Sequence, residues 1–313
     1  MAITGTKFKL NTGAEIPAIG LGTWRSVPGE AQNAVKYAIE FGYRHIDTAR
    51  AYGNEADVGE GLAQAFKTGQ VKREEVFITA KLWSTFHTRV AEGLEESLRN
   101  LGLEYIDLFL MHWPVATNDK GNHPMFPTHP DGSRDILTGS SHIETYKDME
   151  KLLDTGKVKA IGVCNYSLKY LKELIQQCSI IPAVNQIENH PLLPQEEIVE
   201  FCKETGILVT AYSPFGSDGG PLLNQNAILQ VAMKRGVSTA TILLSWHTAR
   251  GSCVLSKSII PSRIESNYHL VDLDESEMEA IASFTKKHVA EHGFQRYVYP
   301  PWGIDFGFPD KSP

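Results

Sequence analysis

Short apolar runs rich in β-branched residues alternate along the chain with longer segments of helical periodicity. The first run covers residues 18–22, and a second ends at Ile46. Six more runs end near Lys81, His112, Val163, Gln186, Tyr212 and Leu255. Apolar runs joined by helices are typical of parallel strands buried on both faces, so the pattern predicts an eight-stranded parallel sheet.

Amphipathic segments predict the connecting helices. Pro28 suits a first helical turn through its fixed φ and missing N–H, and Gly42 suits the end of that helix. Further helices are expected near residues 55–67, 88–101, 142–155, 168–177, 195–204, 225–235 and 274–285. A β-hairpin is expected before all of them, because residues 11–14 carry turn chemistry between two short extended segments.

No shift in composition and no long linker divides this series, so residues 1–313 are predicted to form one domain. Eight strands alternating with helices favour an α/β fold closed into a (β/α)₈ TIM barrel, whose functional residues lie at the carboxyl ends of the strands. The alternative is an open, doubly wound sheet with a Gly-x-Gly-x-x-Gly turn after its first strand. Only the first two glycines of that motif occur, at Gly20 and Gly22, and the barrel is preferred.

Composition and charge limit the partners. The 313 residues are 42% hydrophobic and carry 37 acidic against 30 basic side chains, a net charge of −7. The basic residues form no stripe suited to a phosphate backbone, so nucleic-acid binding is not expected. The N-terminus lacks the apolar core of a signal peptide, and no stretch approaches the roughly 20 apolar residues that span a bilayer. We therefore expect a cytoplasmic protein without membrane contact.

Cysteine and histidine spacing gives no metal or disulfide motif. Paired Cys-x-x-Cys spacing is missing, so free thiols are expected at Cys164, Cys178, Cys202 and Cys253. Three histidines in or next to a Pro/Gly-rich segment, at positions 123, 129 and 142, lack the spacing of metal ligands, and no metal site is assigned.

Four polar residues fall at or just beyond the ends of separate apolar runs, namely Asp47, Tyr52, Lys81 and His112. Each alone has an ordinary structural explanation, such as a loop cap, a wall residue or a solvated strand end. Together, at adjacent strand ends of a barrel, they suit the protonation of an alkoxide. Lys81 would favour the tyrosinate form of Tyr52, and Asp47 would keep the lysine charged and in place. His112 would donate to or orient a carbonyl oxygen, which leaves Tyr52 as the general acid.

No serine or cysteine nucleophile accompanies these four residues, so the electrophilic carbon must receive a hydride from another molecule. At this point the motifs resemble those of the aldo-keto reductases, in particular the aldose, xylose and polyol or glycerol-type reductases. The resemblance covers nearly the whole chain and follows the family's order through residues 22–24, 42–55, 78–83, 110–114, 161–166, 185–188, 211–214 and 257–258. It implies NADPH-dependent reduction of an aldehyde or ketone, reversible with polyols, and a nicotinamide cofactor, NADPH or NADP, bound without a Rossmann domain.

The resemblance also implies a cofactor site. Tyr212 matches the aromatic residue that stacks on the nicotinamide, and Asn165 and Gln186 match the side chains that bond its carboxamide. Loop 213–222 is expected to offer backbone donors to a pyrophosphate, and the segment from Lys257 to Arg263 matches the 2′-phosphate site. The predicted cofactor-binding residues are Gly22, Thr23, Trp24, Asp47, Cys164, Asn165, Gln186, Tyr212, Ser213, Phe215, Ser217, Lys257, Ser258, Arg263 and Asn267.

Three positions depart from the family pattern. Cys164 stands in place of the usual serine, Ser256 in place of a proline, and Ser266 in place of an acidic adenine partner. A thiol is a weaker hydrogen-bonding group than a hydroxyl. NADPH is therefore preferred, while additional use of NADH stays open.

The substrate pocket implied by the resemblance is aromatic, with Trp24, Tyr52, Trp83, His112, Trp113 and Trp302. A long loop at 115–141 and a tail at 295–313 are expected to cover its mouth and to determine the specificity among aldoses, glyceraldehyde and ketones.

A nicotinamide-binding regulatory subunit of a partner protein is the alternative function. The intact set of four residues argues against it. A hydrolase barrel is a further alternative, but it would need paired carboxylates or a metal at the strand ends. The sequence places neither of them there, so the hydrolase ranks below the other two functions. We expect a monomer or a weak dimer that acts on a small carbonyl or polyol.

Overall fold

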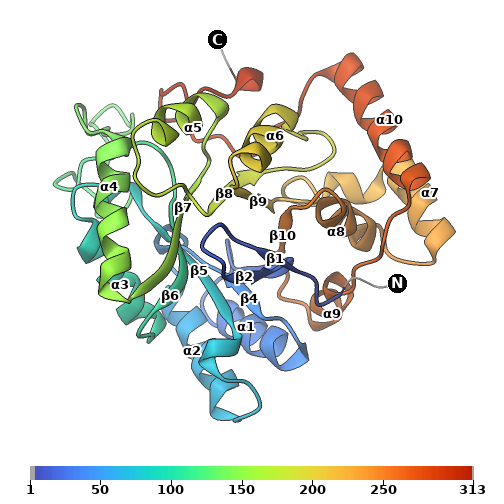
Figure 1. Ribbon diagram of the computed structural model, residues 1–313, viewed down its shortest axis with the longest axis horizontal. Coiled ribbons are helices and arrows are strands. Elements are labelled where there is room, and N and C mark those ends of the chain that lie inside the picture. The colour runs from blue at the N-terminus through green and yellow to red at the C-terminus, as the bar shows by residue number, and fades with distance from the viewer. Residues whose placement is uncertain (1–3, 312–313) are drawn as a thin grey trace.

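The computed structural model describes residues 4–311, so residues 1–3 and 312–313 of the predicted single domain and tail lie outside the description. Eight parallel strands close into a barrel in the order β10-β3-β4-β5-β6-β7-β8-β9, which confirms the predicted (β/α)₈ fold (Figure 1). The strands are β3 (Ile19–Gly22), β4 (His45–Asp47), β5 (Phe77–Leu82), β6 (Ile106–Met111), β7 (Val158–Cys164), β8 (Val184–Glu188), β9 (Leu208–Tyr212) and β10 (Cys253–Ser256).

Helices cover the outside of the barrel (Figure 1). The α-helices are α1 (Glu30–Phe41), α2 (Glu55–Lys67), α3 (Val90–Leu101), α4 (His142–Leu152), α5 (Leu168–Ile175), α6 (Glu196–Glu204), α7 (Asn226–Arg235), α8 (Thr239–Ala249), α9 (Pro261–Tyr268) and α10 (Glu275–His292). Short 3₁₀ helices are η1 (Arg50–Tyr52), η2 (Arg73–Glu75), η3 (Ser84–Phe86), η4 (Leu153–Thr155), η5 (Pro221–Asn224) and η6 (Pro309–Lys311).

Two helices were missing from the predicted set. Helix α8 is buried from Thr241 to Thr248 without a break, so it shows no alternation between an apolar and a polar face. Helix α9 has only two buried residues, Ile264 and Asn267, and is too short to show a period. The prediction for Pro28 was also off by two residues, because α1 begins at Glu30.

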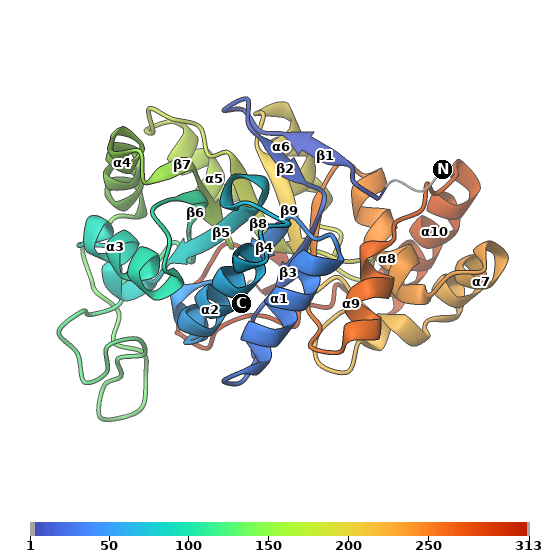
Figure 2. The ribbon, with the colours of Figure 1, turned by 90° about the horizontal axis from the view of Figure 1, so that it is seen from below.

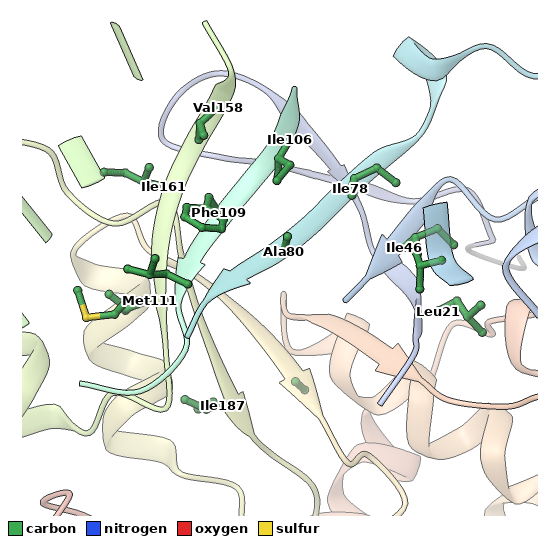
Figure 3. Packing of buried hydrophobic residues seen from close by; sticks show 14 of the residues in the cluster. Leu21, Ile46, Ile78, Ala80, Ile106, Phe109, Met111, Val158, Ile161 and Ile187 are labelled. Atoms are coloured by element: carbon green, nitrogen blue, oxygen red, sulfur yellow. The ribbon is translucent and has the colours of Figure 1, made fainter. Parts of the chain in front are cut away.

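Alternation along each strand builds two apolar layers. In β6, Leu108 and Leu110 join the cluster that fills the barrel, whereas Phe109 and Met111 join the cluster between the sheet and the helices. Figure 3 shows the second layer, in which Ile78, Phe109 and Ile161 come from the three consecutive strands β5, β6 and β7. The barrel is therefore packed on both faces, as expected for parallel strands.

The predicted hairpin closes one end of the barrel. Strands β1 (Lys7–Lys9) and β2 (Glu15–Pro17) pair antiparallel, and the side chains of Leu10 and Ile16 enter the inner apolar cluster. They pack there with Phe77 and Cys253, the first residues of β5 and β10. Because apolar side chains plug this amino end, any open site must lie at the carboxyl ends of the strands.

Two irregular segments extend over that carboxyl end. The loop between β6 and α4 projects from the barrel (Figure 2) and contains two isolated bridges, Thr117 with Ile136 and Thr128 with Arg134. The tail after α10 returns across the opening, where residues 297–302 line the cleft described below. Within residues 4–311, no single helix is long and apolar enough to cross a membrane; α7 and α8 meet that length and composition only as a pair bent by 93°.

Candidate active site

A cleft of about 1180 Å³ opens at the carboxyl end of the barrel. Every strand end contributes to its wall, directly or through the residues that follow it, and so do the long loop and the tail. All predicted cofactor and substrate residues line this cleft, as do three of the four predicted catalytic residues. The fourth, Lys81, lies directly beneath the wall and is fully buried.

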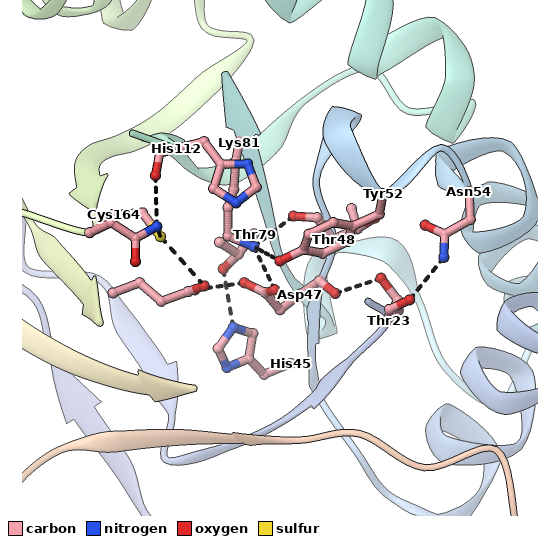
Figure 4. Close-up of polar contacts among 12 residues, drawn as sticks. Thr23, His45, Asp47, Thr48, Tyr52, Asn54, Thr79, Lys81, His112 and Cys164 are labelled. Atoms are coloured by element: carbon pink, nitrogen blue, oxygen red, sulfur yellow. Dashed lines mark hydrogen bonds and ion pairs between the residues drawn. The ribbon is translucent and has the colours of Figure 1, made fainter. Parts of the chain in front are cut away.

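Lys81 connects the predicted catalytic residues (Figure 4). Its Nζ donates to Asp47 Oδ1 at 2.6 Å and to the Tyr52 hydroxyl oxygen at 3.1 Å. The remaining ammonium proton reaches the backbone oxygen of Thr48 at 3.0 Å. Because lysine can only donate, the Tyr52 oxygen is the acceptor in their bond. The hydroxyl hydrogen of Tyr52 is thereby left to point elsewhere, as a proton donor requires.

Burial and charge act in opposite directions on these groups. Burial raises the pKa of Tyr52, and the Lys81 ammonium opposes that rise without reversing it. Burial alone would lower the pKa of Lys81, but Asp47 and Tyr52 outweigh it, so that pKa is raised. Lys81 thus lowers the pKa of Tyr52, as predicted, while burial raises it and keeps the phenol protonated. An acid is present at neutral pH because of that balance.

His112 follows β6 and completes the group. Its ring meets the Tyr52 ring edge to face at 5.7 Å, and the Trp83 ring at 5.2 Å. Burial, reinforced by Lys81, lowers the pKa of His112 well below its usual value, so the imidazole is neutral. A neutral imidazole can donate one hydrogen bond to a carbonyl oxygen without taking up charge.

The residues predicted to hold the nicotinamide form a connected network on the floor of the cleft. Tyr212 donates to Asn165 Oδ1 at 2.6 Å, and Asn165 Nδ2 donates to the His112 carbonyl at 2.9 Å. Gln186 Nε2 donates to Asp47 Oδ2 at 2.7 Å, a contact across the barrel that the sequence did not predict. Cys164 lies within this network, 3.9 Å from the Gln186 side-chain oxygen.

Three of the four non-glycine residues with a left-handed φ within residues 4–311 line the cleft, and the fourth, Gln195, does not. Asn165 and Ser213 take left-handed φ values of 61° and 53°, as does Arg25 at 56°, and all three line the cleft. A non-glycine residue in this region is uncommon and persists where surrounding contacts fix it. Asn165 and Ser213, which follow β7 and β9, are thus held in an uncommon backbone conformation at the wall of the cleft.

The far end of the cleft is cationic. Lys257 and Arg263 are exposed there beside the buried Ser258 and Asn267. Within residues 4–311, neither cation forms an ion pair, so both are available to a dianion such as a 2′-phosphate. The chemistry of these residues fits NADPH, and a cleft of this volume exceeds the usual range for a single small ligand.

The opposite end is aromatic. Trp302 from the tail packs against Trp83 at 5.9 Å and against Trp113 at 5.8 Å. Trp24 stands apart at the rim, 38% exposed, with the Arg25 guanidinium stacked on it. Rings from three strand ends and the tail thus enclose the space above Tyr52 and His112.

Sequence reasoning missed several cleft residues. Arg25 pairs with Asp218 across the cofactor side, residues 238–240 lie at the start of α8, and Phe126 and Arg134 enter from the long loop. Loop residues carry no periodic signal, and α8 was not predicted. Arg25 is the exception, because it directly follows the predicted cleft residue Trp24 in the sequence.

Comparison with known proteins agrees with this geometry. The model of the aldo/keto reductase family matches residues 18–286. The chain belongs to this family. It is 55% identical to the D-galacturonate reductase of Hypocrea jecorina over 99% of the chain and 100% of that protein. It is 47% identical to the glycerol 2-dehydrogenase (NADP(+)) of Saccharomyces cerevisiae, over 94% of each. The solved structure of a Bombyx mori aldo-keto reductase in complex with NADP superposes with a TM-score of 0.80, at 38% identity, covering 90% of this chain and 94% of that one.

The protein is therefore an NADPH-dependent aldo-keto reductase that reduces an aldehyde or ketone to the alcohol, and it fits the polyol and aldose reductase branch. The relatives named above are reductases and a dehydrogenase, and the alternative of a regulatory subunit receives no support from them.

Proposed function

We propose that the enzyme reduces the aldehyde of a sugar acid of the D-galacturonate type, with Asp47, Tyr52, Lys81 and His112 as its catalytic residues. The observation that carries the chemistry is Lys81, whose buried ammonium joins Asp47 to Tyr52 beneath an aromatic pocket. The substrate class is supported by the 55% identity to a D-galacturonate reductase over essentially the whole of both chains.

The residues of this chain handle the proton. When bound, NADPH supplies the hydride that the carbonyl carbon accepts. Neutral His112 donates a hydrogen bond to the carbonyl oxygen, which orients the carbonyl and polarises it. Tyr52 then transfers its hydroxyl proton to the oxygen, and Lys81 stabilises the tyrosinate left behind. Asp47 balances the lysine charge throughout.

The same proposal assigns the cofactor residues. Tyr212, Asn165 and Gln186 hold the nicotinamide end, and the loop with Ser213, Phe215 and Ser217 lies along the diphosphate. The 2′-phosphate and the adenine are bound by Lys257, Ser258, Arg263 and Asn267. The remaining contacts with the cofactor are made by Gly22, Thr23, Trp24, Asp47 and Cys164. Support comes from their common cleft and from the unpaired cations at its far end.

A pair of matched sugars tests the substrate. D-galacturonate and D-galactose differ only in a carboxylate or a CH₂OH group at C6, so their kcat/KM values with NADPH isolate the acid. We expect D-galacturonate to be reduced faster, with DL-glyceraldehyde as a small neutral reference and NADH assayed beside NADPH. Equal kcat/KM for the two sugars would reject the sugar acid while leaving the reductase chemistry intact.

The proposal keeps three wider expectations from the sequence. Residues 1–313 form one domain, the enzyme acts in the cytoplasm, and it is a monomer or a weak dimer. Cell fractionation and sedimentation of the purified protein over a concentration series measure the last two.

A further inference from the structure

Arg134 is a cation in the aromatic end of the cleft that the catalytic mechanism does not use. It lies in the long loop, where it bridges to Thr128, and its guanidinium faces the rings of Phe126 at 5.5 Å and Trp302 at 5.7 Å. Trp302 contacts Trp83, which in turn contacts His112. An unbroken series of rings therefore connects the guanidinium to the carbonyl-binding group.

The guanidinium has bonding capacity to spare. Its Nη1 donates to the Pro127 carbonyl at 3.2 Å, while Nε is buried and has no partner, and Nη2 has none among the described residues. Within the same part of the chain no carboxylate pairs with Arg134, although Arg50, Arg73, Arg89, Arg235, Arg250 and Arg296 all have acidic partners. Burial lowers the pKa of Arg134, and no acidic neighbour opposes that effect.

The surrounding charges favour an anion here. Among residues 4–311, the acidic residues that line the cleft are Asp47, neutralised by Lys81, and Asp218, paired with Arg25. Of the other cations that line the cleft, Arg25 is paired with Asp218, and Lys257 and Arg263 lie at the end assigned to the 2′-phosphate. A guanidinium presents parallel N–H donors that match a carboxylate, and desolvation by neighbouring rings strengthens such a bond.

We propose that Arg134 is the residue that selects an acidic substrate, by binding the carboxylate of a sugar acid at the end of the molecule away from its aldehyde. This inference rests on the proposed function and deepens it, because it places the two ends of the substrate. The carboxylate meets the long loop, and the aldehyde meets Tyr52 and His112. The loop thereby contributes specificity, and the barrel contributes the chemistry.

Arg134→Gln tests the assignment by removing the charge and keeping a polar side chain. We expect kcat/KM for D-galacturonate to fall about 10- to 100-fold through a higher KM, the loss typical of a charge-assisted hydrogen bond. The kcat/KM for DL-glyceraldehyde, which has no carboxylate, should stay within about 2-fold. Arg134→Lys should recover part of the loss. A purely structural role for Arg134 would instead lower both activities together.

Arg89→Gln is the matched control. Arg89 holds the same loop through Asp119 at 3.2 Å but does not line the cleft, so its loss should leave the ratio of the two activities unchanged. An unchanged ratio in Arg134→Gln, or an equal change in Arg89→Gln, would overturn the proposal for Arg134. If wild-type enzyme reduces glyceraldehyde but not D-galacturonate, the proposed substrate fails separately. Inhibition of glyceraldehyde reduction by the diacid galactarate then decides on Arg134: a weaker effect on Arg134→Gln than on wild type supports it, and equal inhibition overturns it.

Discussion

Two buried carboxylates end strands of the same barrel and have different partners. Asp47 ends β4 and is 2% exposed; Glu188 ends β8 and is fully buried. Asp47 accepts from the Lys81 ammonium and the Gln186 amide. Glu188 accepts from the backbone N–H groups of Tyr297 and Val298, at 2.8 and 2.7 Å, and contacts His190 Nε2 at 3.0 Å.

The partners determine what each carboxylate can do. Asp47 faces a cation, so it stabilises the charged form of Lys81, the lysine proposed to support proton transfer. Glu188 faces backbone donors of the tail, so it fixes a chain segment that lines the cleft. Next to that anchor, Arg296 forms a bidentate pair with Asp310 at 2.8 Å. Similar burial thus supports chemistry at one strand end and architecture at the other, and four measurements can test that division.

Removal of the acid itself should have the largest effect. Tyr52→Phe keeps the ring but deletes the proton donor held by Lys81, so kcat should fall by ~10² to 10⁴, as is usual for a general acid. Fluorescence titration should show nearly unchanged NADPH affinity. Turnover at the wild-type rate in this variant would remove Tyr52 from the mechanism.

Asp47→Asn should have a smaller effect, because the phenol remains. We expect kcat to fall about 10- to 100-fold. Asp47 raises the pKa of Lys81, whereas burial lowers it, so the variant lysine should lose its proton at a lower pH. The pH above which kcat declines should therefore move down relative to wild type. A pH profile of kcat with an unmoved alkaline limb would contradict the charge coupling of Asp47 and Lys81.

Glu188→Gln should act on the tail and spare the chemistry. An amide nitrogen cannot accept, so one of the two backbone bonds is lost, which costs the tail about 1–3 kcal/mol of local stability. Hydrogen exchange at Tyr297 and Val298 should accelerate, and KM for the carbonyl substrate should rise several-fold with kcat little changed. A collapse of kcat comparable to that of Asp47→Asn would show that the two carboxylates are not functionally distinct.

The smallest effect concerns pH. Because the pKa of His112 is far below its usual value, this histidine does not titrate near neutrality. In wild type, kcat/KM should vary by less than about 2-fold between roughly pH 6 and pH 8. A clear ionisation in that range, absent from a His112→Gln variant, would show that His112 is charged during the reaction.

The sequence alone was most informative about residues that end or directly follow a strand. Asp47, Lys81 and His112 follow strongly apolar runs, so their common location follows once the barrel is recognised. The bond from Gln186 to Asp47 was not predictable, because it crosses the barrel between residues 139 positions apart. Helix α8 was not predicted because it has no polar face. The position of Arg134 in the cleft was not predicted because its loop has no repeating pattern. What remained hidden was pairing between distant segments and the conformation of irregular ones.

The hairpin that plugs the amino end of the barrel also constrains the order of kinetic events. With Leu10 and Ile16 filling that end, the cleft is blind, and everything that enters must pass the same mouth beneath the long loop and the tail. The nicotinamide residues lie on the floor, and the tryptophans lie above them. We therefore expect an ordered sequence, in which the cofactor binds before the carbonyl substrate and the alcohol leaves before the oxidised cofactor.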